Sequence, residues 1–142
     1  MLMVEIKETE KKKEYLLGYK NATEDIRKMK ERYSELKMSK IYPSVISDGM
    51  PHASNKTDLS GYAAKVDEME RNIVKARYNR AKKKQEIEKA IKTVEKKEER
   101  TILFLRYIRL LSWNQVMDVT GIRPLYKIFR VHGRALNHVI ID

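Results

Sequence analysis

Within residues 4–38, apolar residues recur from Tyr15 to Leu36 at alternating steps of four and three, and mostly Lys, Glu, Arg and Asp lie between them. This heptad spacing predicts one long amphipathic helix with a coiled-coil seam. Gly18 lies off the seam and should cost about 1 kcal/mol relative to alanine, which the pattern can absorb. The seam consists of Tyr15, Tyr19, Ala22, Ile26, Met29, Tyr33 and Leu36.

A second seam of the same kind predicts another long helix, from Asp58 as N-cap to about Val94. Its apolar positions are interrupted at Arg80 and Lys83 and then resume. The two helices could pair as an antiparallel hairpin, or they could pair between two chains. The second seam consists of Leu59, Tyr62, Val66, Met69, Ile73 and Ala76, followed by Ile87, Ala90 and Val94.

Residues 39–57 separate the two long patterns. They contain two of the three prolines, Pro43 and Pro51, and no helical periodicity. A residue that precedes proline favours extended backbone, so this stretch predicts a loop, which we expect to be partly disordered. Residues 1–94 are therefore expected to form a helical hairpin or coiled coil with a loop at about 39–57.

Three shorter helical patterns follow within residues 95–142, which we expect to form a second domain. The first covers Glu98–Leu111, and the second covers Trp113–Val119, with Ser112 in the N-cap position. Gly121 suits a tight helix exit, and Arg123-Pro124 opens a third helix that runs to about Ile140. This order predicts a helix-turn-helix, in which the second helix of the motif enters the DNA major groove. The fold class is thus all-α.

The last predicted helix has two chemically distinct faces. Leu125, Ile128, His132, Ala135 and Val139 lie on one face. The other face carries Arg123, Lys127, Arg130 and Arg134 and no acidic residue. Arginine binds guanine through two hydrogen bonds, and both cations bind phosphate, so this face predicts DNA binding. The expected contacts are Arg123, Tyr126, Lys127, Arg130 and Arg134, with Asn114 and Gln115 of the preceding helix touching the backbone.

The overall charge supports a polyanionic partner, since 31 Lys and Arg face 20 Asp and Glu, a net charge of +11. A second basic cluster is expected to give auxiliary backbone contacts or else to form a solvated helix face. It consists of Lys75, Arg77, Arg80, Lys82, Lys83 and Lys84. The longest apolar run, Ile102–Leu105, is far too short to cross a membrane, and the N-terminus resembles no signal peptide.

Catalytic and metal chemistry has little support in the sequence. The histidines are His52, His132 and His138, and none has a second histidine or a carboxylate at a helical metal-site spacing. There is no cysteine and no glycine-rich phosphate loop. We therefore expect no enzyme activity, no cofactor and no bound metal, and we expect His132 to have a packing or hydrogen-bonding role.

The segments EERTILFLRYI and LSWNQVMDVTGI resemble the start of region 4 of sigma-70-type transcription factors. The segments VHGRAL and SDGMP resemble phage and prophage regulators, the RinA/ArpU-like late-gene activators. These resemblances imply a sequence-specific transcription regulator that binds double-stranded DNA in the bacterial host cytoplasm. In this interpretation the coiled coil sets the oligomeric state or binds RNA polymerase. The alternative is a coiled-coil structural or adaptor protein whose sigma-like module docks onto another protein.

Overall fold

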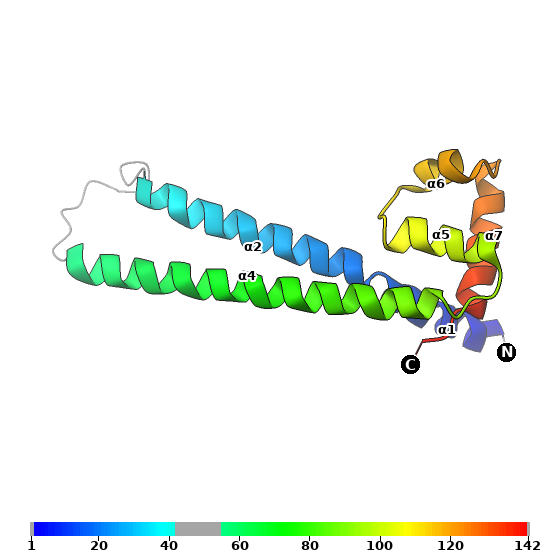
Figure 1. The fold of residues 1–142 in the computed structure, drawn as a ribbon, viewed down its shortest axis with the longest axis horizontal. Helices are drawn as coiled ribbons and strands as arrows, with labels where there is room; N and C mark the ends of the chain where they lie inside the picture. Colours follow the sequence, from blue (N-terminus) through cyan, green and yellow to red (C-terminus); the bar gives the residue numbers. More distant parts are fainter. Residues whose placement is uncertain (1, 42–54, 142) are drawn as a thin grey trace. The chain divides into compact units, whose positions relative to one another are not determined.

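The structure, a computed structural model, describes residues 2–41 and 55–141. These residues form six α-helices and no strand, so the predicted all-α fold class is confirmed for them (Figure 1). The predicted loop at residues 39–57 lies mostly outside the described residues, although helical structure covers residues 39–41 and 55–57. The helices are α1 (Leu2–Leu16), α2 (Gly18–Ile41), α4 (Asn55–Ile91), α5 (Lys97–Tyr107), α6 (Trp113–Thr120) and α7 (Leu125–His138).

The first predicted helix is two helices in the structure. A single turn residue, Leu17, separates α1 from α2, so the expectation of one uninterrupted helix was wrong. The interruption lies beside Gly18, and glycine has a lower helix propensity than any residue except proline. Gly18 also makes room for α4, because a β-carbon at this position would collide with the side chain of Lys83. A larger residue at this position would require the Lys83 side chain to shift, so the small size of glycine favours the packing seen here.

The helices group into two compact units, Met1–Ala22 with Arg80–Asp142, and Thr23–Asn79. This division differs from the predicted one, which separated residues 1–94 from residues 95–142. The difference arises because α1 and the last turns of α4 pack with the three short helices. We call the first the C-terminal unit and the second the hairpin unit.

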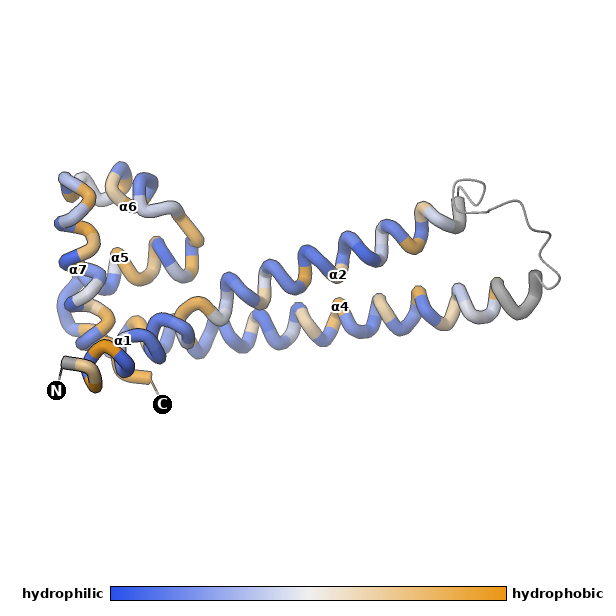
Figure 2. The backbone as a smooth tube through the Cα atoms, turned by 180° about the vertical axis from the view of Figure 1, so that it is seen from behind, coloured by the Kyte–Doolittle hydropathy of each residue, from blue (hydrophilic) through white to orange (hydrophobic). Residues whose placement is uncertain are grey.

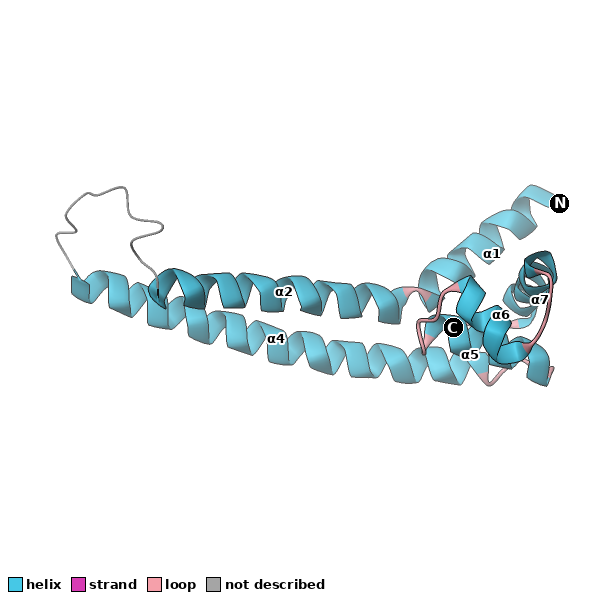
Figure 3. Cartoon of the chain, turned by 90° about the horizontal axis from the view of Figure 1, so that it is seen from above, coloured by secondary structure: helices cyan, strands magenta, loops and turns pink. Residues whose placement is uncertain are grey.

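In the hairpin unit, α2 and α4 run antiparallel and side by side (Figures 1 and 3). Ile26 and Ile73 of the two predicted seams are buried, and the Oη of Tyr33 donates a hydrogen bond to Glu70 Oε1 at 2.5 Å. Apolar positions recur singly along otherwise hydrophilic helices (Figure 2). Pairing within one chain is therefore what the structure shows. Leu59, at the start of the second seam, is exposed.

The C-terminal unit has two apolar clusters. The smaller cluster joins α5, α6 and α7 through buried Ile102, Val116, Ile128 and Val131. The larger cluster extends beyond these three helices and explains why the unit includes α1 and the end of α4. Its buried members are Leu16, Ile87, Ala90, Ile91, Val94, Leu103, Tyr107, Ile108, Ala135, Leu136 and Val139. No helix in the described part of the chain is long and apolar enough to cross a membrane.

Candidate nucleic-acid interface

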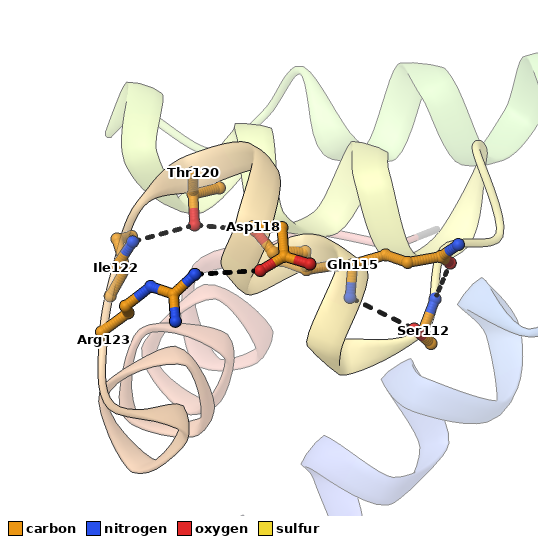
Figure 4. Close-up of polar contacts among 7 residues, drawn as sticks. Ser112, Gln115, Asp118, Thr120, Ile122 and Arg123 are labelled. Carbon is orange, nitrogen blue, oxygen red and sulfur yellow. Dashed lines mark hydrogen bonds and ion pairs between the residues drawn. The ribbon is translucent and has the colours of Figure 1, made fainter.

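Helix α6 is defined by strong local signals at both ends. Ser112 has extended backbone, and its hydroxyl accepts a hydrogen bond from the backbone N–H of Gln115 at 3.2 Å. The side-chain oxygen of Gln115 accepts from the N–H of Ser112 at 2.8 Å, which completes a capping box (Figure 4). Gly121 ends the helix with φ of 73°, a left-handed conformation that glycine adopts without strain. The predicted N-cap and exit are confirmed.

The turn between α6 and α7 is held by polar contacts. Thr120 Oγ1 donates to the carbonyl of Val116 and accepts from the N–H of Ile122 at 3.3 Å. Arg123 Nη2 lies 3.0 Å from Asp118 Oδ1, so this arginine already has an anionic partner (Figure 4). Both side chains of this ion pair are exposed, so solvent weakens it. Arg123 is accessible, but a phosphate would have to compete with Asp118.

Helix α7 begins at Leu125, one residue later than predicted, because Pro124 takes the N-cap position with extended backbone. Ile128, His132, Ala135 and Val139 are buried and Leu125 is partly buried, so the predicted apolar face is confirmed. Val131 and Leu136 are also buried on this side. Packing of this face against α5 and α6 fixes which side chains of α7 point outwards.

The outward side of α7 carries the predicted cations. Lys127, Arg130 and Arg134 are exposed, and Tyr126 is 57% exposed. Within the described residues no ion pair involves any of these three cations, in contrast to Arg123. The helix contains no acidic residue. The guanidinium of Arg130 lies 5.7 Å from the centre of the Tyr126 ring, one helical turn away.

Phe129 is a residue of this surface that the sequence pattern did not identify. It is 46% exposed and meets the ring of Trp113 edge-on, with ring centres 5.3 Å apart. The contact joins α6 to the outer side of α7, and nothing local in the sequence indicates it. Asn114 and Gln115 at the start of α6 are exposed as expected. However, the side-chain oxygen of Gln115 is occupied by the capping box, so Asn114 is the freer of the two.

Helix α1 borders the basic face of α7, which the sequence also did not indicate. An open groove of about 430 Å³ is lined by Glu5, Ile6 and Thr9 from α1 and by residues of α7 that include Arg130 and Arg134. The ammonium of Lys12 donates to the backbone carbonyl of Asn137 at 3.1 Å. A carboxylate therefore lies on one side of the arginines, next to the C-terminal half of α7.

Behind the interface, His132 is buried and shares a hydrogen bond of 2.7 Å with the Tyr107 hydroxyl. The role expected for His132 is thus confirmed. Burial lowers the pKa of His132 to about 4, and the nearby charges of Lys13 and Arg106 act in the same direction. Burial likewise raises the pKa of Tyr107 to about 12. Both side chains are therefore uncharged at neutral pH and support α7 as a neutral pair.

A second internal contact joins the start of α5 to the end of α7. The Nδ1–H of His138 donates to Glu99 Oε1 at 2.5 Å, and the Glu99 side chain is 2% exposed. Glu99 Oε2 is buried without a hydrogen-bond partner. The helical period accounts for this burial, because Glu99 lies three and four residues before the buried Ile102 and Leu103. In the first turn of α5 the carboxylate also complements the helix dipole.

In the second basic cluster, some side chains make structural contacts and others are exposed to solvent. The ammonium of Lys83 lies 4.4 Å from the Tyr15 ring centre, and that of Lys84 lies 5.9 Å from the Tyr19 ring centre. Lys75, Arg77 and Lys82 are exposed, and Arg80 is partly buried. Lys83 and Lys84 thus take part in packing with α1 and α2, which leaves the exposed members as the better candidates for backbone contacts.

No group of three or more His, Asp or Glu side chains that could hold a metal ion occurs among the described residues. In the comparison with protein families, residues 52–137 match the family described as "Protein of unknown function (DUF1492)". No curated protein and no solved structure matches the chain. The match covers all of α4, α5 and α6, and all of α7 except its last residue, His138.

Proposed function

The chain belongs to the DUF1492 family, and we propose that it binds double-stranded DNA through α6 and α7 and regulates transcription of phage or prophage genes. The observation that carries this proposal is the separation of faces on α7. Its apolar side is buried against α5 and α6, and its opposite side presents Lys127, Arg130 and Arg134 without a neutralising partner among the described residues. Exposed cations outside ion pairs can bind the phosphates of the DNA backbone, and exposed arginines can bind guanine edges.

The arrangement of α6 and α7 fits a helix-turn-helix. A short capped helix, a left-handed glycine exit and a second, basic helix follow in that order. In this proposal α7 lies in the major groove and Asn114 contacts the backbone from the first turn of α6. The resemblance of residues 98–122 to sigma-70 region 4, and of VHGRAL and SDGMP to RinA/ArpU-like activators, favours late-gene activation.

RNA polymerase remains the proposed protein partner, and the protein is proposed to act in the bacterial host cytoplasm. The hairpin unit pairs α2 with α4 inside one chain, so both seams are already partly or fully covered there, apart from Leu59. A homo-oligomer would therefore need a surface other than these seams.

The test is the salt dependence of duplex binding, measured by fluorescence anisotropy with random-sequence duplexes at several salt concentrations. Lys127→Ala should weaken binding to all duplexes alike and lower the magnitude of the slope of log K against log salt by about 1, because one phosphate contact is lost. Lys28→Ala is the control, since it removes the same charge from an exposed position of the hairpin unit.

The double variant Arg130→Ala, Arg134→Ala should lose more affinity than either single variant. Wild-type affinity and slope in this double variant would show that α7 does not face DNA. If the wild-type protein at micromolar concentration and low salt binds no duplex at all, the adaptor function is favoured instead.

A further inference from the structure

Tyr126 and Arg130 lie one turn apart on the exposed side of α7. Their guanidinium-to-ring distance of 5.7 Å is within the range in which a cation is attracted to an aromatic face. Neither residue packs into the two apolar clusters of the C-terminal unit. The pair therefore orders two exposed side chains and adds nothing to the apolar core. Packing of the core does not explain why these two side chains are in contact.

The contact with the ring limits how the arginine can move. An exposed arginine normally loses rotamer freedom when it binds, and an ordered guanidinium loses less. Arg123 differs, because its guanidinium is held by Asp118 on the turn before α7. In contrast to Arg123, Arg130 is thus positioned by an uncharged ring and takes part in no ion pair among the described residues.

A planar guanidinium binds guanine O6 and N7 in the major groove through two hydrogen bonds. Tyr126 lies in the first turn of α7, the part of a recognition helix that reaches base edges. A ring that borders such a guanidinium would lie over the neighbouring base pair. Among the bases, thymine alone presents an apolar methyl group in the major groove, and aromatic side chains contact it favourably.

We propose that Tyr126 and Arg130 act as one reading unit for a thymine next to a guanine in the major groove. Arg130 binds the guanine, and Tyr126 positions Arg130 and contacts the thymine methyl. This inference rests on the proposed function and names the base step that α7 would select.

The experiment begins with the full-length protein and a random duplex library, from which bound fragments are sequenced. The enriched site should contain a thymine–guanine step. Affinity is then measured for the selected duplex, for a scrambled duplex and for the selected duplex with deoxyuridine in place of that thymine. Deoxyuridine differs from thymidine only in lacking the methyl group. The affinity of the wild-type protein for this duplex should therefore be about fourfold lower, as expected for the loss of one buried methyl group.

Tyr126→Ala should reduce affinity for the selected duplex by about fivefold or more, through loss of the ring contact, and should have little effect on the scrambled duplex. In this variant deoxyuridine should no longer lower the affinity. Tyr126→Phe keeps the ring and should behave as wild type. Tyr78→Ala, which removes another exposed tyrosine outside α7, is the control and should leave the preference for the selected duplex unchanged.

An enriched site without a thymine–guanine step would overturn the inference, as would a deoxyuridine effect that persists unchanged in Tyr126→Ala. If Tyr126→Phe lost the same affinity for the selected and the scrambled duplex, the Tyr126 hydroxyl would be shown to bind a phosphate. That result would also refute the reading unit. In each of these cases the protein still binds DNA, so the proposed function stands. Failure of wild type to bind any duplex refutes both.

Discussion

The contact between Glu99 and His138 allows a quantitative prediction about the stability of the C-terminal unit. The Glu99 side chain is 2% exposed and the His138 side chain is 51% exposed. His138→Ala removes the one hydrogen-bond partner that the Glu99 carboxylate has among the described residues, because Oε2 is already unpaired. The variant therefore leaves a buried carboxylate with neither oxygen satisfied.

The expected loss follows from the burial of the two groups. Leaving a buried hydrogen-bond acceptor without its partner costs roughly 1–3 kcal/mol, and more for a charged group. His138 is half exposed, so water can enter the space left by the imidazole and solvate part of the carboxylate. We therefore expect His138→Ala to lower the free energy of unfolding by about 2 kcal/mol, within the range for a buried unsatisfied acceptor.

The partner variants separate the hydrogen bond between Glu99 and His138 from other effects of the histidine. Glu99→Leu removes the buried carboxylate and fills similar space, so it should change stability by less than about 1 kcal/mol, since such replacements are often neutral. The double variant Glu99→Leu, His138→Ala should then be more stable than His138→Ala alone. The coupling free energy from this cycle isolates the contact between Glu99 and His138 from the other interactions of each residue.

Urea unfolding is the appropriate assay. Trp113 is the one tryptophan of the chain and lies in the C-terminal unit, so its fluorescence reports on that unit while circular dichroism reports on all helices. Asn137→Ala, an exposed neighbour in the last turn of α7, is the control and should stay within about 0.5 kcal/mol of wild type. A double variant no more stable than His138→Ala would refute the coupling.

Two further predictions concern the support of α6 and α7. Ser112→Ala removes the side-chain acceptor of the capping box and should destabilise the C-terminal unit by about 1 kcal/mol in the same urea assay; an unchanged midpoint would show that the cap contributes nothing. The lowered pKa of His132 means that the unfolded chain takes up a proton near pH 6.5 and the folded protein only near pH 4. The contribution of neutral His132 to the free energy of unfolding should therefore be complete above pH 6.5 and should fall by up to about 3 kcal/mol as the pH decreases to 4. His132→Gln should flatten this part of the dependence of stability on pH.

The sequence predicted those features of the fold that depend on local helical period. Ile26 and Ile73 of the two seams and the apolar face of α7 are buried as predicted, whereas Leu59 of the second seam is exposed. Ser112 and Gly121 define α6 because capping is decided within a few residues. Each of these features depends only on residues that are close in the sequence, so a sequence pattern is enough to predict it.

The division into units depended on packing between distant segments. Leu16 is fully buried, yet in the sequence it lies off the seam and close to the glycine beside which the helix is interrupted. Ile87, Ala90 and Val94 were expected to continue the seam, but they line the same cluster as Leu103 and Leu136. Periodicity shows that a helix face is apolar, but it does not show which element covers that face. The sequence pattern alone therefore could not decide whether the predicted boundary between the two units at residue 94 was correct.

The position of α1 beside the basic face restricts how DNA could approach. Glu5 and Ile6 line the groove beside Arg130 and Arg134, while Tyr126 lies outside that lining. A carboxylate in this groove disfavours a phosphate beside it, so the first turn of α7, which lies outside the groove, offers the most favourable approach. Helix α1 lies outside the segment that matches the family, and Lys12 connects it to the last turn of α7. The pattern of α7 alone treats its cations as equivalent, whereas the position of α1 distinguishes Lys127, which lies outside the groove, from Arg130 and Arg134, which line it.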